Sequence, residues 1–163
     1  MAEQLGYGVE SVRQWVKRAE IDAATALVAP TVNSYKRLRV GECVSGTRWA
    51  PALVAHGPNN RTAAIRTLHG RFEWRLPDSS ANPYLATAAL IAAGLDGIDR
   101  KLALPAECTD DLFELSAEQA AERGLARLPQ RLGDALDALA GDEVIRVALG
   151  DTLSNEFIRL KRA

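Results

Sequence analysis

Charged and apolar side chains alternate along residues 71–76. Charged residues occupy every second position, at Arg71, Glu73 and Arg75. The positions next to them are apolar, namely Phe72, Trp74 and Leu76. Because successive side chains of a β-strand point to opposite faces, the alternation predicts a strand with one charged face and one apolar face.

A second strand is predicted over residues 60–66, and the short link 67–70 contains Gly70, which favours a hairpin. The simplest register gives three cross-strand pairs: Arg66 with Arg71, Ala64 with Glu73, and Thr62 with Arg75. Arg66, Arg71, Arg75 and Glu73 then share one face. Two interpretations remain open from the residues alone: a solvated outer face, or a surface that receives an anion.

Helical periodicity follows residue 80. Asn82 suits the N-cap and Pro83 the first position of a helix that runs towards Gly97. Four more helices are predicted over 116–123, 129–139, 142–149 and 151–161, with Ser116 and Asp142 as caps. The predicted fold class is α+β: a short antiparallel sheet from about residue 50 to 76, covered by helices on one side and at the C-terminal end, and preceded by a short helical segment.

The composition is that of an ordinary cytoplasmic globular chain. It has 20 basic and 21 acidic residues, a net charge of −1, so we expect no overall attraction to nucleic acid or to a membrane surface. No apolar run is long enough to cross a bilayer, and no signal peptide is apparent. Cys43 and Cys108 are too isolated for a zinc cluster or a disulfide framework. His56 and His69 are expected on the surface or in loops.

Five segments together resemble the C-terminal part of the glutamine synthetase catalytic domain. They are NSYKRL (33–38), WAP (49–51), NNRTAAIR (59–66), RFEWRLPD (71–78) and SANPYLATAALIAAGLDGI (80–98). The segments SGTRWAP, 125–150 and EFIRLKRA resemble the glutamate-amine ligase branch, which includes enzymes similar to glutamate-methylamine ligase. The resemblance implies a role in nitrogen metabolism: ATP phosphorylates the side-chain carboxylate of glutamate, and ammonia or an amine displaces phosphate, with Mg²⁺ or Mn²⁺ as the metal.

The resemblance also implies residue roles. Arg37 and Arg75 match the arginines that hold the glutamate substrate. Arg61 matches the arginine that stabilises the transferring phosphoryl group, and Arg66 and Arg71 match those that contact the nucleotide phosphates. Glu73 matches a carboxylate ligand of the metal. These roles agree with the chemistry, because guanidinium forks fit carboxylate and phosphate oxygens and hard divalent metals take oxygen ligands.

Two departures from the family pattern affect the expected activity. Trp49 stands where the common pattern has a glutamate before Ala-Pro, which leaves open whether ammonia or an alkylamine is the nucleophile. The chain is also much shorter than a complete glutamine synthetase, and most of the metal carboxylates of that enzyme have no counterpart in it. We therefore expect a truncated, inactive fragment over residues 27–163 that keeps part of the phosphate and glutamate surface. Self-association or binding to a full-length homologue is a further expectation.

Residues 1–26 follow a different pattern, and AEQLGYGVESVRQWV resembles the helix-turn-helix of insertion-element transposases. The polar residues of its helical face are Arg13, Gln14, Lys17 and Arg18, which suit phosphate and base-edge contacts. The alternative is an amphipathic helix with a hydrated face. Three function classes thus remain: a working ligase, an inactive fragment of ligase ancestry, and a DNA-binding module.

Overall fold

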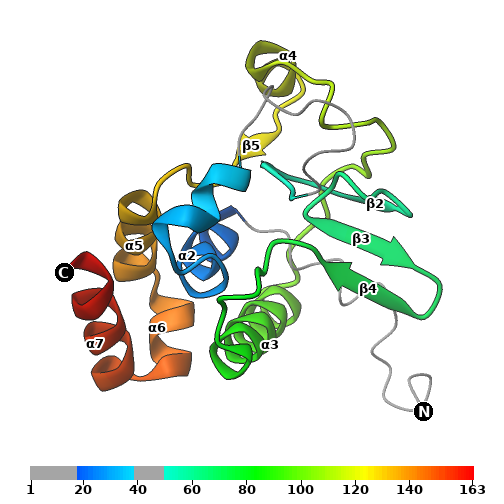
Figure 1. The fold of residues 1–163 in the computed structure, drawn as a ribbon. Helices are drawn as coiled ribbons and strands as arrows, with labels where there is room; N and C mark the ends of the chain where they lie inside the picture. The colour runs from blue at the N-terminus through cyan, green and yellow to red at the C-terminus, as the bar shows by residue number, and fades with distance from the viewer. Residues whose placement is uncertain (1–17, 39–49) are drawn as a thin grey trace.

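Helices gather on one side of the molecule and a small mixed sheet lies on the other (Figure 1). The computed structural model describes residues 18–38 and 50–163. The helical side consists of α2 (Arg18–Val28), η2 (Val32–Arg37), α3 (Pro83–Asp99), α5 (Leu132–Gly141), α6 (Glu143–Leu149) and α7 (Asp151–Arg162). The remaining elements are β1 (Leu53–Val54), β2 (His56–Pro58), β3 (Ile65–Leu68), β4 (Arg71–Trp74), α4 (Ala117–Glu122) and β5 (Ala126–Arg127).

Helix α2 is the centre of the main core. It packs against α3, α5 and α6, and Ala23, Leu27 and Val28 are fully inaccessible to solvent. Thr25 is also buried, and its hydroxyl donates a 2.7 Å hydrogen bond to the carbonyl oxygen of Ile21. Every residue from Ala23 to Val28 is buried, so the C-terminal half of α2 is enclosed by its neighbours. The boundary expected after residue 26 therefore falls within one buried helix.

The helices follow the predicted caps. The Asn82 side chain accepts from the backbone of Tyr84 at 2.9 Å, Pro83 begins α3, and Ser116 forms a capping box with Gln119. Asp142 caps α6 by accepting from the Ile145 amide at 2.8 Å. Helix α5 begins at residue 132 rather than at 129, because the Leu128 amide donates to Ala52 and continues the pairing of β5 with β1.

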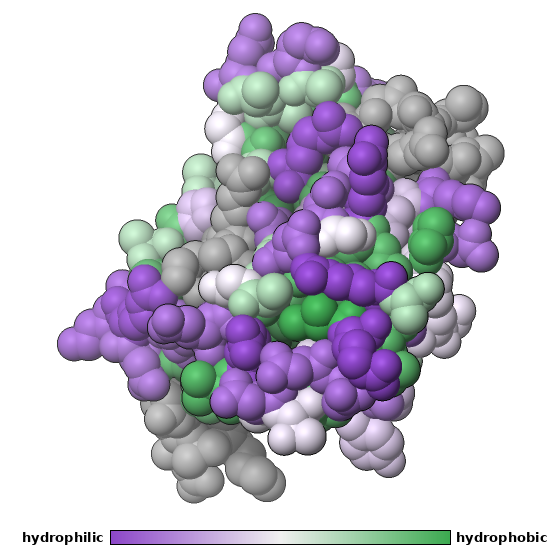
Figure 2. Space-filling model, turned by 90° about the vertical axis from the view of Figure 1, so that its left-hand side faces the viewer, coloured by the Kyte–Doolittle hydropathy of each residue, from purple (hydrophilic) through white to green (hydrophobic). Residues whose placement is uncertain are grey.

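The outer face of the helical side is mainly polar. Figure 2 shows hydrophilic side chains surrounding smaller apolar areas on this face. Exposed apolar residues of α6 and α7 include Val147, Leu153 and Leu160. Within the described ranges, the helices are too short or too polar to cross a membrane.

The three-stranded sheet differs from the predicted antiparallel arrangement. Strand β3 pairs antiparallel with β4 but parallel with β2, and β1 forms a separate antiparallel pair with β5. Residues 60–64, predicted as strand, form no strand: 61–64 are turns and bends, and the segment carries the chain from β2 back to the start of β3. This return connection is what makes the β2–β3 pair parallel.

The hairpin register also differs from the simplest one. Arg66 pairs with Glu73, and Leu68 pairs with Arg71, so the turn contains only His69 and Gly70. Gly70 has a φ of 73°, the left-handed conformation that a two-residue hairpin turn favours. The predicted pairing of Arg66 with Arg71 is therefore wrong. The observed register replaces a repulsive pair with an attractive one.

The loop 105–112 is fixed to β2 by buried polar groups. The Cys108 amide donates to the His56 carbonyl at 2.8 Å, and the Asn60 side chain donates to the carbonyls of Cys108 and Asp110, both at 2.9 Å. His56 is only 1% exposed, and its Nε2 lies 2.9 Å from the Pro105 carbonyl oxygen. The prediction of a surface or loop position for His56 is thus wrong, because this loop covers it. His69 is exposed in the hairpin turn, as predicted.

The close approach of this loop predicts that Gly57 does not tolerate a side chain. A Cβ at Gly57 would overlap the carbonyl oxygen of Cys108. Gly57→Ala should lower the free energy of unfolding by roughly 1–3 kcal/mol, as overpacking does in rigid surroundings. Gly133→Ala is the control, because its Cβ would meet open space in α5. Urea denaturation measures both variants, and equal stability of the two would contradict the close approach.

Candidate functional site

Five arginines gather at the sheet and at the end of η2, and with two carboxylates they form a surface that we call the arginine face. Strands β3 and β4 position Arg66, Arg71 and Glu73, and Arg75 follows β4 directly. The arginine face consists of Arg37, Arg61, Arg66, Arg71, Arg75, Glu73 and Asp78. The period-2 alternation thus correctly predicts which side chains of the hairpin share a face.

Glu73 is the central anion of the arginine face. Arg66 Nη1 donates to Glu73 Oε2 at 2.9 Å, and Arg75 Nη1 lies 3.8 Å from the same oxygen. The hydrogen bond from Arg66, together with the charges of Arg66, Arg75 and Arg71, holds the pKa of Glu73 below its ordinary value. Glu73 is therefore ionised at neutral pH, yet it offsets only part of the surrounding positive charge.

The arginines repel one another. Partial burial lowers the pKa of Arg75, and the charges of Arg66 and Arg61 lower it further, which places Arg61 within electrostatic range of the hairpin. Positive charges that repel one another in this way favour the binding of an anion between them. A phosphate or carboxylate, whose oxygens match the guanidinium fork, would relieve the repulsion.

Arg37 joins the face from η2. Its Nη2 donates to the carbonyl oxygen of Leu76 at 2.8 Å and lies 3.6 Å from Asp78 Oδ2. Asp78 in turn accepts from the Ser80 amide at 2.8 Å, and its own amide donates to Val28 at the end of α2 at 3.0 Å. Partial burial raises the pKa of Asp78, but hydrogen bonds from Ser34 and Ser80 and the charge of Arg37 hold it below its ordinary value.

Strands β3 and β4 offer a metal ion only one carboxylate, that of Glu73. Divalent Mg²⁺ and Mn²⁺ prefer several oxygen ligands, and Glu73 Oε2 is already bonded to Arg66. In the described ranges, no group of three or more His, Cys, Asp or Glu side chains has the arrangement of a metal site. Among the described residues, Glu73 would therefore supply one ligand to a metal that is also bound by other groups, but these residues do not form a metal centre by themselves.

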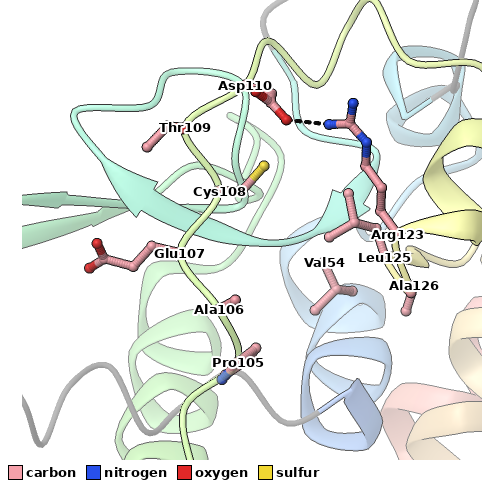
Figure 3. A pocket seen from close by; sticks show the side chains of 11 residues that line it. Val54, Pro105, Ala106, Glu107, Cys108, Thr109, Asp110, Arg123, Leu125 and Ala126 are labelled. Carbon is pink, nitrogen blue, oxygen red and sulfur yellow. Dashed lines mark hydrogen bonds and ion pairs between the residues drawn. The ribbon is translucent and has the colours of Figure 1, made fainter.

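A second candidate site is a cleft of about 480 Å³ between the 105–110 loop and the segment 123–126. Figure 3 shows the Asp110 and Arg123 side chains pointing towards each other, with Cys108 beside them. The lining contains no residue of the arginine face. Because Asp110 pairs with Arg123, this cleft lacks the excess of positive charge that characterises the arginine face.

Sequence reasoning did not identify two residues that hold the arginines in place. Asp78 contacts Arg37, and Asn59 accepts a hydrogen bond from Arg66 Nε at 3.1 Å. Both are small polar residues outside the strands: Asn59 directly follows β2, and Asp78 lies four residues after β4. Such residues are common in turns, so neither carries a sequence signal for this role.

Comparison with protein families identifies one match over most of the chain. The family model described as "Glutamine synthetase, catalytic domain" matches residues 18–163. Glutamate–methylamine ligase of Methyloversatilis universalis is 54% identical over 139 residues, which cover 85% of this chain and 31% of that protein. Glutamine synthetase of Pyrococcus abyssi is 45% identical over 145 residues, which cover 86% of this chain and 31% of that protein.

Solved structures agree with these matches. A structure titled "GmaS/ADP complex-Conformation 1" superposes with a TM-score of 0.80 at 39% identity, over 94% of this chain and 35% of that one. A structure titled "Apo GmaS without ligand" superposes with a TM-score of 0.73 at 35% identity. The chain thus spans about a third of the length of the relatives that it matches.

The comparisons confirm the predicted family and its partial catalytic-domain fold. They give no support to the resemblance of residues 1–26 to a transposase, and the family match already includes residues 18–26. They likewise give no support to the DNA-binding alternative. Residues 1–17 and 39–49, which include Arg13 and Trp49, lie outside the described residues.

The contacts of Asp78 predict a specific loss of stability in acid. Asp78→Asn should lower the free energy of unfolding at pH 7 by about 1–3 kcal/mol, because charge-assisted hydrogen bonds are lost. The folded pKa of Asp78 lies below the unfolded value of about 3.9, so its contribution is present above that pH and disappears as the pH falls through the folded value.

Denaturation at pH 7 and at about pH 2.5 measures this prediction, and the gap between wild type and Asp78→Asn should narrow in acid. Asp137→Asn is the control, since the exposed pair of Asp137 with Arg162 should contribute only about 0–1 kcal/mol. An equal difference in the free energy of unfolding between wild type and Asp78→Asn at both pH values would show that the contribution of Asp78 does not depend on its negative charge.

Proposed function

Because the chain belongs to the glutamine synthetase family, we propose that its arginine face is the glutamate- and phosphate-binding part of a glutamate-amine ligase site. The proposal rests chiefly on one observation: Arg66, Arg71 and Arg75 surround the carboxylate of Glu73, and the charge of Arg61 acts on Arg75. Residue types and spacing match the family motif at each of these positions. The arrangement concentrates guanidinium donors where ligand oxygens would be neutralised.

The proposed reaction transfers the terminal phosphoryl group of ATP to the γ-carboxylate of glutamate and releases ADP. An amine nitrogen then attacks the acyl carbon, phosphate leaves, and the amine loses a proton. Arg66 and Arg71 would contact the nucleotide phosphates, and Arg61 would neutralise charge on the transferring group. Arg37 and Arg75 would hold the glutamate. Phosphoryl transfer depends mainly on such positioning and charge neutralisation.

The amine is proposed to be a small alkylamine such as methylamine, with ammonia as the alternative. Support comes from Trp49, which stands at the position where the common pattern has a carboxylate. An indole does not deprotonate ammonium, but its apolar ring packs well against a methyl group. The similarity to glutamate–methylamine ligase supports the same choice.

Bound Mg²⁺ or Mn²⁺ would supply positive charge that neutralises the phosphates and makes the transferring phosphorus more electrophilic. Glu73 would be this chain's ligand to that metal. The remaining oxygen ligands are not supplied by the described residues. We therefore propose that the described residues bind anions without turnover, and that turnover requires further oxygen ligands to the metal.

The arginine face should bind polyphosphate weakly. We expect a dissociation constant for ATP or pyrophosphate in the millimolar range, about 4 kcal/mol of binding free energy, which weakens as salt is added. Arg66→Ala and Arg71→Ala should weaken binding further. Arg159→Ala removes the same charge from α7, on the helical side of the molecule, and should have little effect. Equal effects of all three variants in a calorimetric titration would show that the ligand responds only to net charge.

The chain alone should not form a γ-glutamyl amide. With ATP, glutamate, methylamine or ammonia, and Mg²⁺ or Mn²⁺, product detected by mass spectrometry should not exceed that of a boiled control. Product above that background, and lost in Arg61→Ala, would mean that this chain completes a metal site by itself or in an oligomer.

A further inference from the structure

Asn59 lies directly after β2 and contacts the guanidinium of Arg66. Its side-chain Oδ1 accepts from Arg66 Nε at 3.1 Å and also from Arg66 Nη2. Arg66 Nη1 donates instead to Glu73 at 2.9 Å. The side chain of Arg66 is therefore held on two sides by different acceptors, one neutral and one charged.

The backbone of Asn59 fixes the position of its amide group. Its φ is 50°, in the left-handed region, and its amide N–H donates to the Thr67 carbonyl oxygen of β3 at 2.9 Å. Asparagine is among the few side-chain-bearing residues that adopt this conformation readily. The same turn that permits the conformation thus places a hydrogen-bond acceptor beside Arg66.

The donors of Arg66 can be counted. A guanidinium carries five N–H groups, one on Nε and two on each terminal nitrogen. Asn59 uses Nε–H and one Nη2–H, and Glu73 uses one Nη1–H. One N–H on each terminal nitrogen then remains beyond these three contacts. Both remaining N–H groups belong to the terminal nitrogens, from which a guanidinium donates to phosphate oxygens.

We propose that Asn59 is a positioning residue: it fixes the Arg66 guanidinium so that two of its N–H groups face a phosphate ligand. The ligand class rests on the proposed function, whereas the positioning of Arg66 does not. A neutral amide suits this role, because it orients the guanidinium without cancelling its charge. A carboxylate at residue 59 would orient Arg66 equally well but would repel the phosphate.

Two substitutions at residue 59, made in the full chain, separate orientation from charge. Asn59→Gly keeps the left-handed backbone and removes the acceptor, and Asn59→Asp keeps the acceptor and adds a negative charge. Asn82→Gly is the control, since Asn82 caps α3 and glycine is also tolerated at that position. Arg66→Ala combined with Asn59→Gly tests whether Asn59 acts through Arg66.

The first readout is hydrogen exchange of the Arg66 Nε–H, measured by NMR without ligand. We expect protection in wild type, Asn59→Asp and Asn82→Gly, and faster exchange in Asn59→Gly. The second readout is the affinity for pyrophosphate. Asn59→Gly should weaken it by about 3-fold to 10-fold, Asn59→Asp should weaken it despite intact protection, and Asn59→Gly should add nothing in the Arg66→Ala background.

The two readouts distinguish failure of this inference from failure of the proposed function. Unchanged Nε–H exchange in Asn59→Gly would overturn the positioning role, as would an equal loss of pyrophosphate affinity with and without Arg66. If wild type binds no pyrophosphate, the proposed function fails, and the exchange of the Arg66 Nε–H still decides whether Asn59 orients that side chain.

Discussion

The pairing of Arg66 with Glu73 across β3 and β4 is the interaction on which the arginine face depends. It sets the hairpin register, because a slip by one residue would send every side chain of one strand to the other face. It also supplies the carboxylate that lets several guanidiniums share a small area. Without Glu73 the repulsion between Arg66, Arg75 and Arg61 would have no counterion within the hairpin.

A hairpin this short would be marginal by itself, and the remainder of the fold holds it in place. Trp74 packs on the main core that contains α2, and the Asp78 amide bonds to the last turn of that helix. On the other side, β2 is fixed to the 105–112 loop through Asn60 and Gly57. The arginine face thus lies on a hairpin that the main core holds on one side and the 105–112 loop, through β2, holds on the other.

Much of this structure could be predicted from the sequence, and the reasons for the failures are physical. Caps such as Asn82 and Asp142 act within one helical turn, so local sequence determines them. The period-2 alternation likewise predicts which charged side chains of the hairpin share a face. The burial of His56 depends on the 105–112 loop, which is distant in the sequence. The hairpin register and the parallel pairing of β2 depend instead on where the turns at 69–70 and 59–64 begin and end, which the alternation of charged and apolar residues does not determine. Asn59 and Asp78 were missed because small polar residues are common in turns and carry no signal for this role.

The central claim is that oxyanions bind at the arginine face and not elsewhere on a nearly neutral chain. The most direct measurement is an NMR titration of the full chain with pyrophosphate that follows the Nε–H signals of its arginines. The account predicts shifts for Arg61, Arg66, Arg71 and Arg75, and none for Arg123, Arg159 or Arg162. Shifts spread over all these arginines, or centred on Arg123 beside the second cleft, would contradict it.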